Sequence, residues 1–297
     1  MTRISILCEN MKDSLFNVLR KQFHSELISN NVLTVDDSGV ASNADKDNLD
    51  SKAISQLLLS QLGVPNLRKK VAAQTLGSQF EKECEVFVKD SFEKLGHLRP
   101  GNWTISRPSG KSRQGITMTE QYRHLETLSK ACEAQPELAA ILGQDYIIKP
   151  DIVIIRAPEE DEVINSCEKL VDEKISNLAS IRKANGGDPI FHASISCKFT
   201  MRSDRAQNSR SEALNLIRNR KGRTPHIVVV TAEPLPSRLA SLALGTGDLD
   251  CVYHIALPEL QKAVNEKGSA DSKECLQIMI DGKRLRDISD LPLDLAI

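Results

Sequence analysis

The sequence predicts an α/β fold in which a mixed central β-sheet is flanked by helices. Short runs rich in β-branched residues alternate along the chain with segments whose apolar residues recur at three- and four-residue steps. No stretch has the composition of a linker, and no internal repeat is visible, so one domain is expected over 1–297. A chain of 297 residues of which 40% are hydrophobic can bury a large core.

The N-terminal half is expected to be mainly helical, because its apolar residues follow the helical period. Helices are expected over 1–30, 52–62, 78–95 and 119–142. The segment 78–95 has the most regular amphipathic pattern of the chain. The polar segment 30–52 predicts a loop, in which Ser42-Asn43-Ala44-Asp45 has the composition of a turn. A short extended piece containing Trp103 is expected over 102–107.

The C-terminal half carries the strands. Four short apolar strands are expected over 146–156, 190–198, 225–233 and 251–256. Helices are expected over 168–183, from Ala206, from about Ser237, and over 257–267. A final strand–turn element is expected over 278–285. Pro150-Asp151 falls inside the first of these strands and is expected to interrupt it.

Composition excludes several classes of protein. Lys and Arg number 39 against 40 Asp and Glu, so the net charge of −1 neither indicates nor excludes a nucleic-acid partner. No apolar run reaches the roughly 20 residues that span a bilayer, and the first residues lack a secretory pattern. The seven cysteines are scattered without a Cys-x-x-Cys pair, which is typical of reduced thiols in the cytoplasm. A zinc site is not expected.

Three separated residues are candidates for metal-assisted hydrolysis. Asp151 lies in an apolar strand and Lys198 ends a second strand, with 46 residues between them; 13 residues separate Lys198 from Glu212. We expect Asp151 and Lys198 on adjacent strands. A second carboxylate would be placed best two residues before Lys198, on the same face of the strand, but that residue is the uncharged Ser196. We therefore expect Glu212, on the following helix, to supply it. Carboxylates bind magnesium, and a lysine beside them orients water and offsets phosphate charge. Individually, Asp151 also fits a satisfied structural aspartate and Lys198 a solvated rim residue.

Further charged residues have both ordinary and functional interpretations. Glu81, Glu83 and Glu85 fit surface charges near a helix N-terminus, or one of them faces the metal site. The cluster Arg202-Ser203-Asp204-Arg205 fits a helix cap with solvated arginines. It also fits a reader of G·C base pairs, because arginine pairs with guanine and aspartate accepts from cytosine.

Several motifs run co-linearly along the chain and together carry a resemblance. They are Pro150-Asp151, Ser196-Cys197-Lys198, Arg202-Ser203-Asp204-Arg205, Glu212, and the stretches H-A-S-I-S-C-K, N-R-K-G-R, P-H-I-V-V-V-T-A-E-P and D-I-S-D-L-P-L-D-L-A. They resemble the NgoMIV type of restriction endonuclease, the CCGG-reading branch of the PD-(D/E)-x-K nucleases. The resemblance covers the chain from about Ser42 onward and is weakest in the helical part at 1–40. It implies a restriction-endonuclease-like core.

The resemblance also implies roles for individual residues. Asp151, Lys198 and Glu212 would be catalytic with Glu81 as an additional acid, and Asp151, Glu212 and the main chain of Cys197 would face two magnesium ions. Arg202, Ser203, Asp204 and Arg205 would read the inner CCGG. Asp45 and Arg238 would read the outer G·C pair, and Gln74 would approach from the minor groove. One departure is Lys46-Asp47, where the family has a serine after S-N-A-D, and it puts one minor-groove contact in doubt.

We therefore expect magnesium-dependent double-strand cleavage of GCCGGC after the first G, leaving a 5′ overhang. The resemblance implies a homotetramer that engages two DNA sites, and a cognate DNA methyltransferase in a bacterial cytoplasm. An inactive or regulatory DNA-binding homologue of the same fold is the alternative, and the intact Asp151, Lys198 and Glu212 argue against it. A structure-specific repair nuclease would not need the base-reading cluster.

Overall fold

A six-stranded mixed sheet organises the molecule. The computed structural model describes residues 13–65, 73–108, 115–142, 149–201, 203–245 and 247–297. The strands lie side by side in the order of the chain: β1 (Trp103–Ser106), β2 (Ile152–Arg156), β3 (Ile190–Lys198), β4 (His226–Thr231), β5 (Cys251–His254) and β6 (Leu285–Asp287). The pairs β1–β2 and β2–β3 are antiparallel, and β3 to β6 run parallel. The predicted mixed sheet flanked by helices is confirmed.

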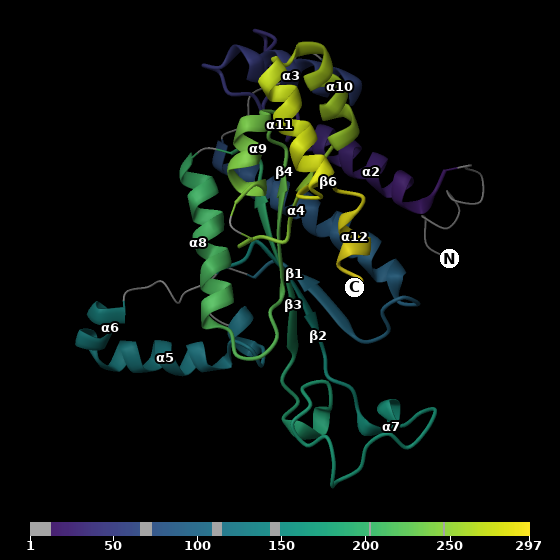
Figure 1. Ribbon diagram of the computed structural model, residues 1–297, viewed down its shortest axis with the longest axis vertical. Helices are drawn as coiled ribbons and strands as arrows, with labels where there is room; N and C mark the ends of the chain where they lie inside the picture. Colours follow the sequence, from purple (N-terminus) through teal and green to yellow (C-terminus); the bar gives the residue numbers. More distant parts are fainter. Residues whose placement is uncertain (1–12, 66–72, 109–114, 143–148, 202, 246) are drawn as a thin grey trace.

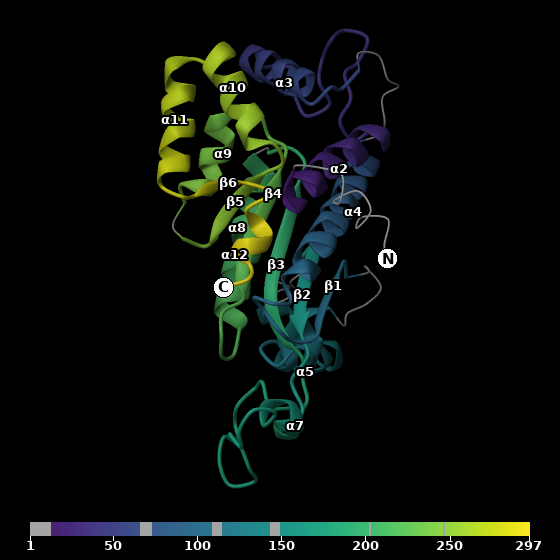
Figure 2. The ribbon, with the colours of Figure 1, turned by 90° about the vertical axis from the view of Figure 1, so that its right-hand side faces the viewer.

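Helices cover both sides of this sheet (Figures 1 and 2). The larger ones are α2 (Leu15–Ser29), α3 (Leu49–Gln61), α4 (Ala73–Phe92), α5 (Arg123–Ala134), α8 (Ser203–Asn219), α9 (Pro236–Ala243), α10 (Leu257–Lys267) and α11 (Ala270–Asp281). Short helical turns are η1 (Glu93–Leu95), η2 (Ile116–Met118), α6 (Pro136–Leu142), α7 (Asp161–Ile164), η3 (Lys183–Asn185) and α12 (Leu291–Asp294). Helix α4 packs against β1 and β3, whereas α9 packs against β5. In Figure 2, α2 and α4 lie on the opposite side of β3 from α9, α10 and α11.

The apolar runs explain why the central strands are buried. In β4 all residues after His226 are buried, and β3 is buried from Phe191 to Cys197. Strands covered on both faces carry continuous rather than alternating apolar residues. Their side chains join those of α2, α3, α4 and α10 in one continuous apolar core. That residues 1–297 form a single domain stays a prediction. No helix in the described ranges is long and apolar enough to cross a membrane.

Several predicted boundaries were wrong. Helix α2 begins at Leu15 behind the cap Ser14, and residues 1–12 lie outside the described ones. Pro136 divides the helix predicted over 119–142 into α5 and α6, because proline lacks the N–H that would continue the hydrogen bonding. Strand β2 begins only at Ile152, so Asp151 precedes this strand and does not interrupt it. Residues 146–148 of that prediction lie outside the described residues.

The helix predicted over 168–183 is absent, and residues 157–189 instead form an irregular arm that projects beyond the sheet (Figure 1, bottom). The side chain of Asn165 accepts hydrogen bonds from the amides of Leu170 (2.8 Å) and Val171 (2.9 Å). Such local bonds compete with a helix, and no neighbouring element buries its apolar residues. Buried Arg182 fixes the base of the arm by pairing with Asp161 at 2.6 Å.

The C-terminal strand–turn element predicted over 278–285 was also wrong. Residues 270–281 form α11, which begins at the cap Ser269, and the strand β6 follows at 285–287. Among the described residues the sheet has six strands, two more than the four apolar strands predicted. Of these two, β1 falls within the extended piece expected over 102–107, whereas β6 was missed; they are four and three residues long. Strands this short leave too few residues to show an alternating pattern.

Candidate active site

Asp151 and Lys198 meet where two neighbouring strands leave the sheet. Asp151 directly precedes β2, Lys198 ends β3, and the pairing of Ile152 with Ile195 brings the two side chains together. Lys198 Nζ lies 3.0 Å from Asp151 Oδ2. The amide of Cys197 donates to the same oxygen at 2.7 Å, and Ser196 Oγ lies 3.4 Å from it. The expected convergence of these two residues is thus present, and the carboxylate is held in one orientation.

Glu212 reaches this pair from α8, the helix that follows β3. Burial raises the pKa of Glu212; the charge of Lys198 opposes the rise, and that of Asp151 adds to it. Burial alone would lower the pKa of Lys198, but Asp151 and then Glu212 outweigh it and the pKa is raised. The three charges therefore act on one another within one site.

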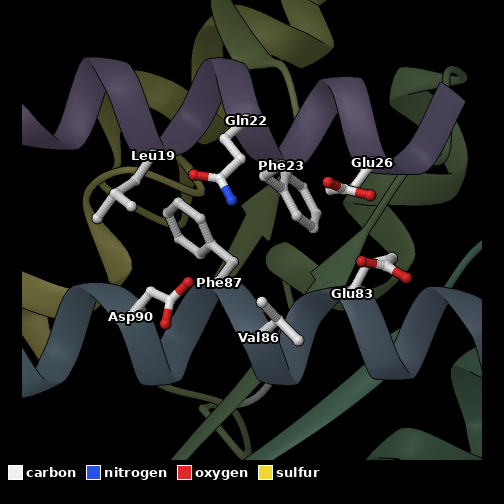
Figure 3. A pocket seen from close by; sticks show the side chains of 8 residues that line it. All are labelled: Leu19, Gln22, Phe23, Glu26, Glu83, Val86, Phe87 and Asp90. Atoms are coloured by element: carbon white, nitrogen blue, oxygen red, sulfur yellow. The ribbon is translucent and has the colours of Figure 1, made fainter. Parts of the chain in front are cut away.

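The structure selects one of the three glutamates on α4. Burial and then the charge of Asp151 raise the pKa of Glu81, although Arg107, 2.9 Å from Glu81 Oε2, opposes them. Buried Glu83 lies elsewhere on the helix, where it accepts a hydrogen bond from Asn30 Nδ2 at 3.1 Å. With Val86, Phe87 and Asp90, it lines a small pocket between α2 and α4 (Figure 3). Glu81 is the member of the three that faces Asp151 and Lys198.

The oxygen atoms at the site are of the kind that binds magnesium, but in the described part of the chain they are not arranged as a metal-binding site. Among the described residues, no group of three or more His, Cys, Asp or Glu side chains is arranged to hold a metal ion. Instead, Lys198 pairs with Asp151 and Arg107 with Glu81. The carboxylates are hard oxygen ligands of the kind magnesium prefers. Burial is the main cause of the raised pKa of Glu81 and of Glu212, and a cation among them would offset the repulsion from Asp151 that adds to it.

Two of the predicted base readers contact each other. Arg238, in the first turn of α9, forms an ion pair through Nη2 with Asp45 Oδ2. Asp45 is the last residue of the predicted turn at 42–45, whose Asn43 is 1% exposed. The amide of Asp45 is held by Ser51 Oγ at 2.8 Å. An arginine and an aspartate from separate segments thus lie side by side.

The structure describes the other predicted base readers only in part. Helix α8 begins at Ser203, three residues earlier than expected, so Ser203, Asp204 and Arg205 belong to its first turn and do not precede it. Their side chains lie outside the described ones, as does the whole of Arg202. Gln74 lies in the first turn of α4, and its side chain is likewise outside the described part of the structure. The backbone that carries Ser203–Arg205 continues directly from Lys198.

Sequence reasoning missed Arg107 and Glu233. Arg107 directly follows β1, and its only sequence signal is its place after an extended segment. Glu233 follows the apolar strand β4, and its residue is 0% exposed. Acidic residues at strand ends are commonly solvated, so only the structure shows that this one is enclosed.

Comparisons with known proteins found a matching family and a curated relative. Residues 23–297 match the family described as NgoMIV restriction enzyme. A curated relative, the type II restriction enzyme NgoMIV of Neisseria gonorrhoeae, is 52% identical over 283 residues. The aligned part covers 95% of this chain and 99% of that relative.

Proposed function

Because the chain belongs to the NgoMIV restriction enzyme family and is a type II restriction endonuclease, we propose that it cleaves GCCGGC with magnesium. Both strands would be cut after the first G, leaving a 5′ overhang. The observation that carries the proposal is the pairing of Lys198 with Asp151, 3.0 Å apart, beside Glu212 and Glu81. This set combines anionic oxygen ligands with one fixed cation, as hydrolysis of a phosphodiester requires.

Each residue has a role that follows from its position. Asp151, Glu212 and the main chain of Cys197 would hold magnesium, with Glu81 as an additional acid. Bound magnesium would neutralise phosphate charge and make a bound water more acidic. Lys198 is cationic beside Asp151 and would donate hydrogen bonds to the attacking water or to a phosphate oxygen. For Glu81 to act on the metal, its ion pair with Arg107 would have to open.

The pair formed by Arg238 and Asp45 supports recognition of the outer base pair. Arginine donates two hydrogen bonds to guanine O6 and N7, and aspartate accepts one from cytosine N4. Two such side chains in contact suit the two bases of one G·C pair. The inner CCGG would be read by Arg202, Ser203, Asp204 and Arg205 at the start of α8, and Gln74 would approach from the minor groove. Lys46-Asp47 leaves the neighbouring minor-groove contact open.

We further propose a homotetramer that binds two DNA sites. The arm at 157–189 supports it, because Val163, Leu170, Ile175 and Leu178 are more than half exposed there. Apolar side chains gathered on a projecting segment are typical of a protein–protein interface. An enzyme that cuts its own recognition site would endanger the host genome, so a cognate DNA methyltransferase is expected to protect GCCGGC in the same bacterial cytoplasm.

Plasmid cleavage tests the proposed function. Plasmids with two, one or no GCCGGC sites are incubated with the protein, with and without magnesium. We expect cleavage only with magnesium, fastest for the two-site plasmid, and fragment ends that map after the first G. Cutting of the site-free plasmid, or an uncut two-site plasmid, would overturn the proposal. Specific binding without cutting would instead identify a regulatory homologue.

A further inference from the structure

Glu233 is a fully enclosed carboxylate outside the catalytic group. It follows β4, and the residue is 0% exposed. Its Oε2 accepts a hydrogen bond from the amide of Met201 at 2.7 Å, and its Oε1 accepts one from the amide of Leu235 at 3.1 Å. A carboxylate in such a place is costly unless it is well bonded, so its bonds to two separate segments indicate a defined role.

Both segments held by Glu233 lead into predicted base readers. Met201 directly precedes Arg202, and α8 begins two residues after it with Ser203. Leu235 is the cap residue of α9, whose first turn carries Arg238. Arg238 Nη1 itself lies 3.9 Å from Glu233 Oε2. The side chain of Glu233 therefore holds the segments that lead into two helices. Helix α8 carries the predicted readers of the inner bases, and α9 carries a predicted reader of the outer pair.

The residue before Glu233 holds a third segment. The amide of Ala232 donates to Phe199 O at 3.2 Å, which ties it to the chain between Lys198 and α8. Its carbonyl accepts from Asn43 Nδ2 at 2.8 Å. Asn43 lies in the turn that leads to Asp45, and its other side-chain atom accepts from Ser55 Oγ at 3.1 Å. All three segments that lead into these predicted readers thus converge on Ala232 and Glu233.

We propose that Glu233 is a positioning residue that sets the inner and outer base readers relative to each other and so controls discrimination over the whole recognition site. The inference rests on the proposed function, since it takes the reader assignments from it. Glu233 would not touch DNA. Bidentate pairing of arginine with guanine requires accurate placement, and an anchor displaced by about 1 Å weakens the correct contact more than contacts to the phosphates.

Glu233→Gln tests this inference with almost no change in volume. The amide group keeps one acceptor but presents N–H donors to the other backbone amide, so the side chain can no longer hold the two segments in place relative to each other. We measure kcat/KM on GCCGGC, on a site with one altered inner pair, and on a site with the outer pair altered. Discrimination against both altered sites is expected to fall about tenfold, the loss expected from one hydrogen bond to a charged group. Binding to site-free DNA and its salt dependence are expected to stay unchanged.

Two control variants separate positioning from general destabilisation. Asp287→Asn removes another buried carboxylate that accepts from a backbone amide, that of Leu257 at 2.9 Å, far along the chain from the readers. It is expected to lower the melting temperature and leave discrimination unchanged. Asp45→Asn is expected to weaken discrimination at the outer pair alone. If Glu233→Gln does not fold, Glu233→Asp replaces it, because the shorter carboxylate cannot reach both amides.

The outcomes are distinct. A folded Glu233 variant that discriminates like the wild type at both positions would show a purely structural role and overturn the inference. Lost discrimination at the outer pair alone would reduce Glu233 to an anchor of α9 and would also overturn it. A wild-type protein that does not cut GCCGGC would refute the proposed function instead. Loss at both positions, with Asp287→Asn unaffected, supports the inference.

Discussion

Lys198 is the residue whose surroundings define its chemistry most clearly. Its side chain is 17% exposed and lies 3.0 Å from Asp151 Oδ2. Burial lowers the pKa of a lysine, but Asp151 and Glu212 more than compensate, and the pKa of Lys198 is raised. The amine is therefore charged at neutral pH. It is suited to stabilising negative charge on the phosphate and to orienting water, and less suited to removing a proton.

Lys198→Ala is expected to lower cleavage at least about 100-fold, because the site loses its fixed cation beside the scissile phosphate. Specific binding measured in calcium is expected to persist, since the base readers lie on other residues. Plasmid cleavage and a gel-shift titration measure the two effects. Lys130→Ala, which removes an exposed lysine paired with Glu126 on α5, serves as the control and should cut normally. Loss of both cleavage and binding would make Lys198 a structural residue.

Glu233 gives the protein a pH-dependent component of stability. Burial is the largest effect and raises the pKa of Glu233 from 4.5 to about 7. The hydrogen bonds from the amides of Met201 and Leu235 oppose the rise, and the charge of Arg238 opposes it further, whereas that of Asp45 adds to it. Because the folded pKa lies above the unfolded one, the contribution is complete below about pH 4.5. It is lost as the pH rises through about 7.

The free energy of unfolding of the wild type, relative to that of Glu233→Gln, is therefore expected to fall by about 3 kcal/mol between pH 4.5 and pH 8. Denaturant unfolding of both proteins across this range measures the difference, and groups common to both cancel. A difference that is flat with pH, or that grows toward pH 8, would contradict the raised pKa.

At the scale of elements, helices and strands with a regular apolar pattern could be predicted from the sequence, whereas the irregular segments could not. Helix α10 and strand β3 have the predicted bounds. The turn at 186–189, with two glycines and a proline, precedes the apolar run of β3, and α10 carries Pro258 in its first turn, where proline is favoured. The arm at 157–189 was wrongly predicted because helical spacing of apolar residues does not reveal whether a neighbour buries them. The same limit applies to the site. The spacing of Asp151 and Lys198 indicated adjacent strands, whereas choosing Glu81 over Glu83 required the orientation of α4.

An ion-pair cluster ties α2 to the C-terminal half. Arg20 Nε lies 2.9 Å from Asp287 Oδ1 at the end of β6, and Nη2 lies 2.5 Å from Glu259 on α10. Burial opposes the charge of Arg20, but Glu259 and Asp287 outweigh it and raise its pKa. Removing Arg20 from this cluster leaves two partly buried carboxylates without their cationic partner.

Arg20→Ala is therefore expected to lower the free energy of unfolding by about 3 kcal/mol. The neighbouring Lys21 provides a matched control, because its side chain is 59% exposed and its partner Asp13 is near the surface. Lys21→Ala should cost less than about 1 kcal/mol. Urea unfolding of the two variants measures both values, and equal losses would show that the cluster adds nothing beyond a surface pair.

At the scale of the whole molecule, residues proposed for cutting and for reading follow one another along two strand–helix units, β3–α8 and β4–α9. Strand β3 ends at Lys198, and α8 begins five residues later with Ser203 and carries Glu212. Strand β4, parallel to β3, leads to Glu233 and then to Arg238 on α9. The parallel half of the sheet thus brings the proposed catalytic lysine and several of the predicted base readers to the carboxyl ends of neighbouring strands. The arm leaves the opposite ends of β2 and β3, which frees it for contacts between subunits.

The arm provides the test of the proposed tetramer. Leu178 is 95% exposed, so Leu178→Asp removes no intramolecular packing and is expected to leave the melting temperature unchanged. In an assembly that buries the arm, the same change would place a charge in an apolar contact. Sedimentation velocity is expected to show the wild type as a tetramer and the variant as smaller species. The variant is also expected to lose its preference for two-site plasmids.

Ile141→Asp is the matched control, because Ile141 on α6 is 80% exposed and lies outside the arm. It should retain both the wild-type mass and the two-site preference, since the added charge stays in water. If Leu178→Asp also keeps the wild-type mass, the arm is not the contact that holds the subunits together. A wild type that sediments as a monomer would refute the tetramer itself. A smaller Leu178→Asp species that still prefers two-site plasmids would separate assembly from two-site cleavage.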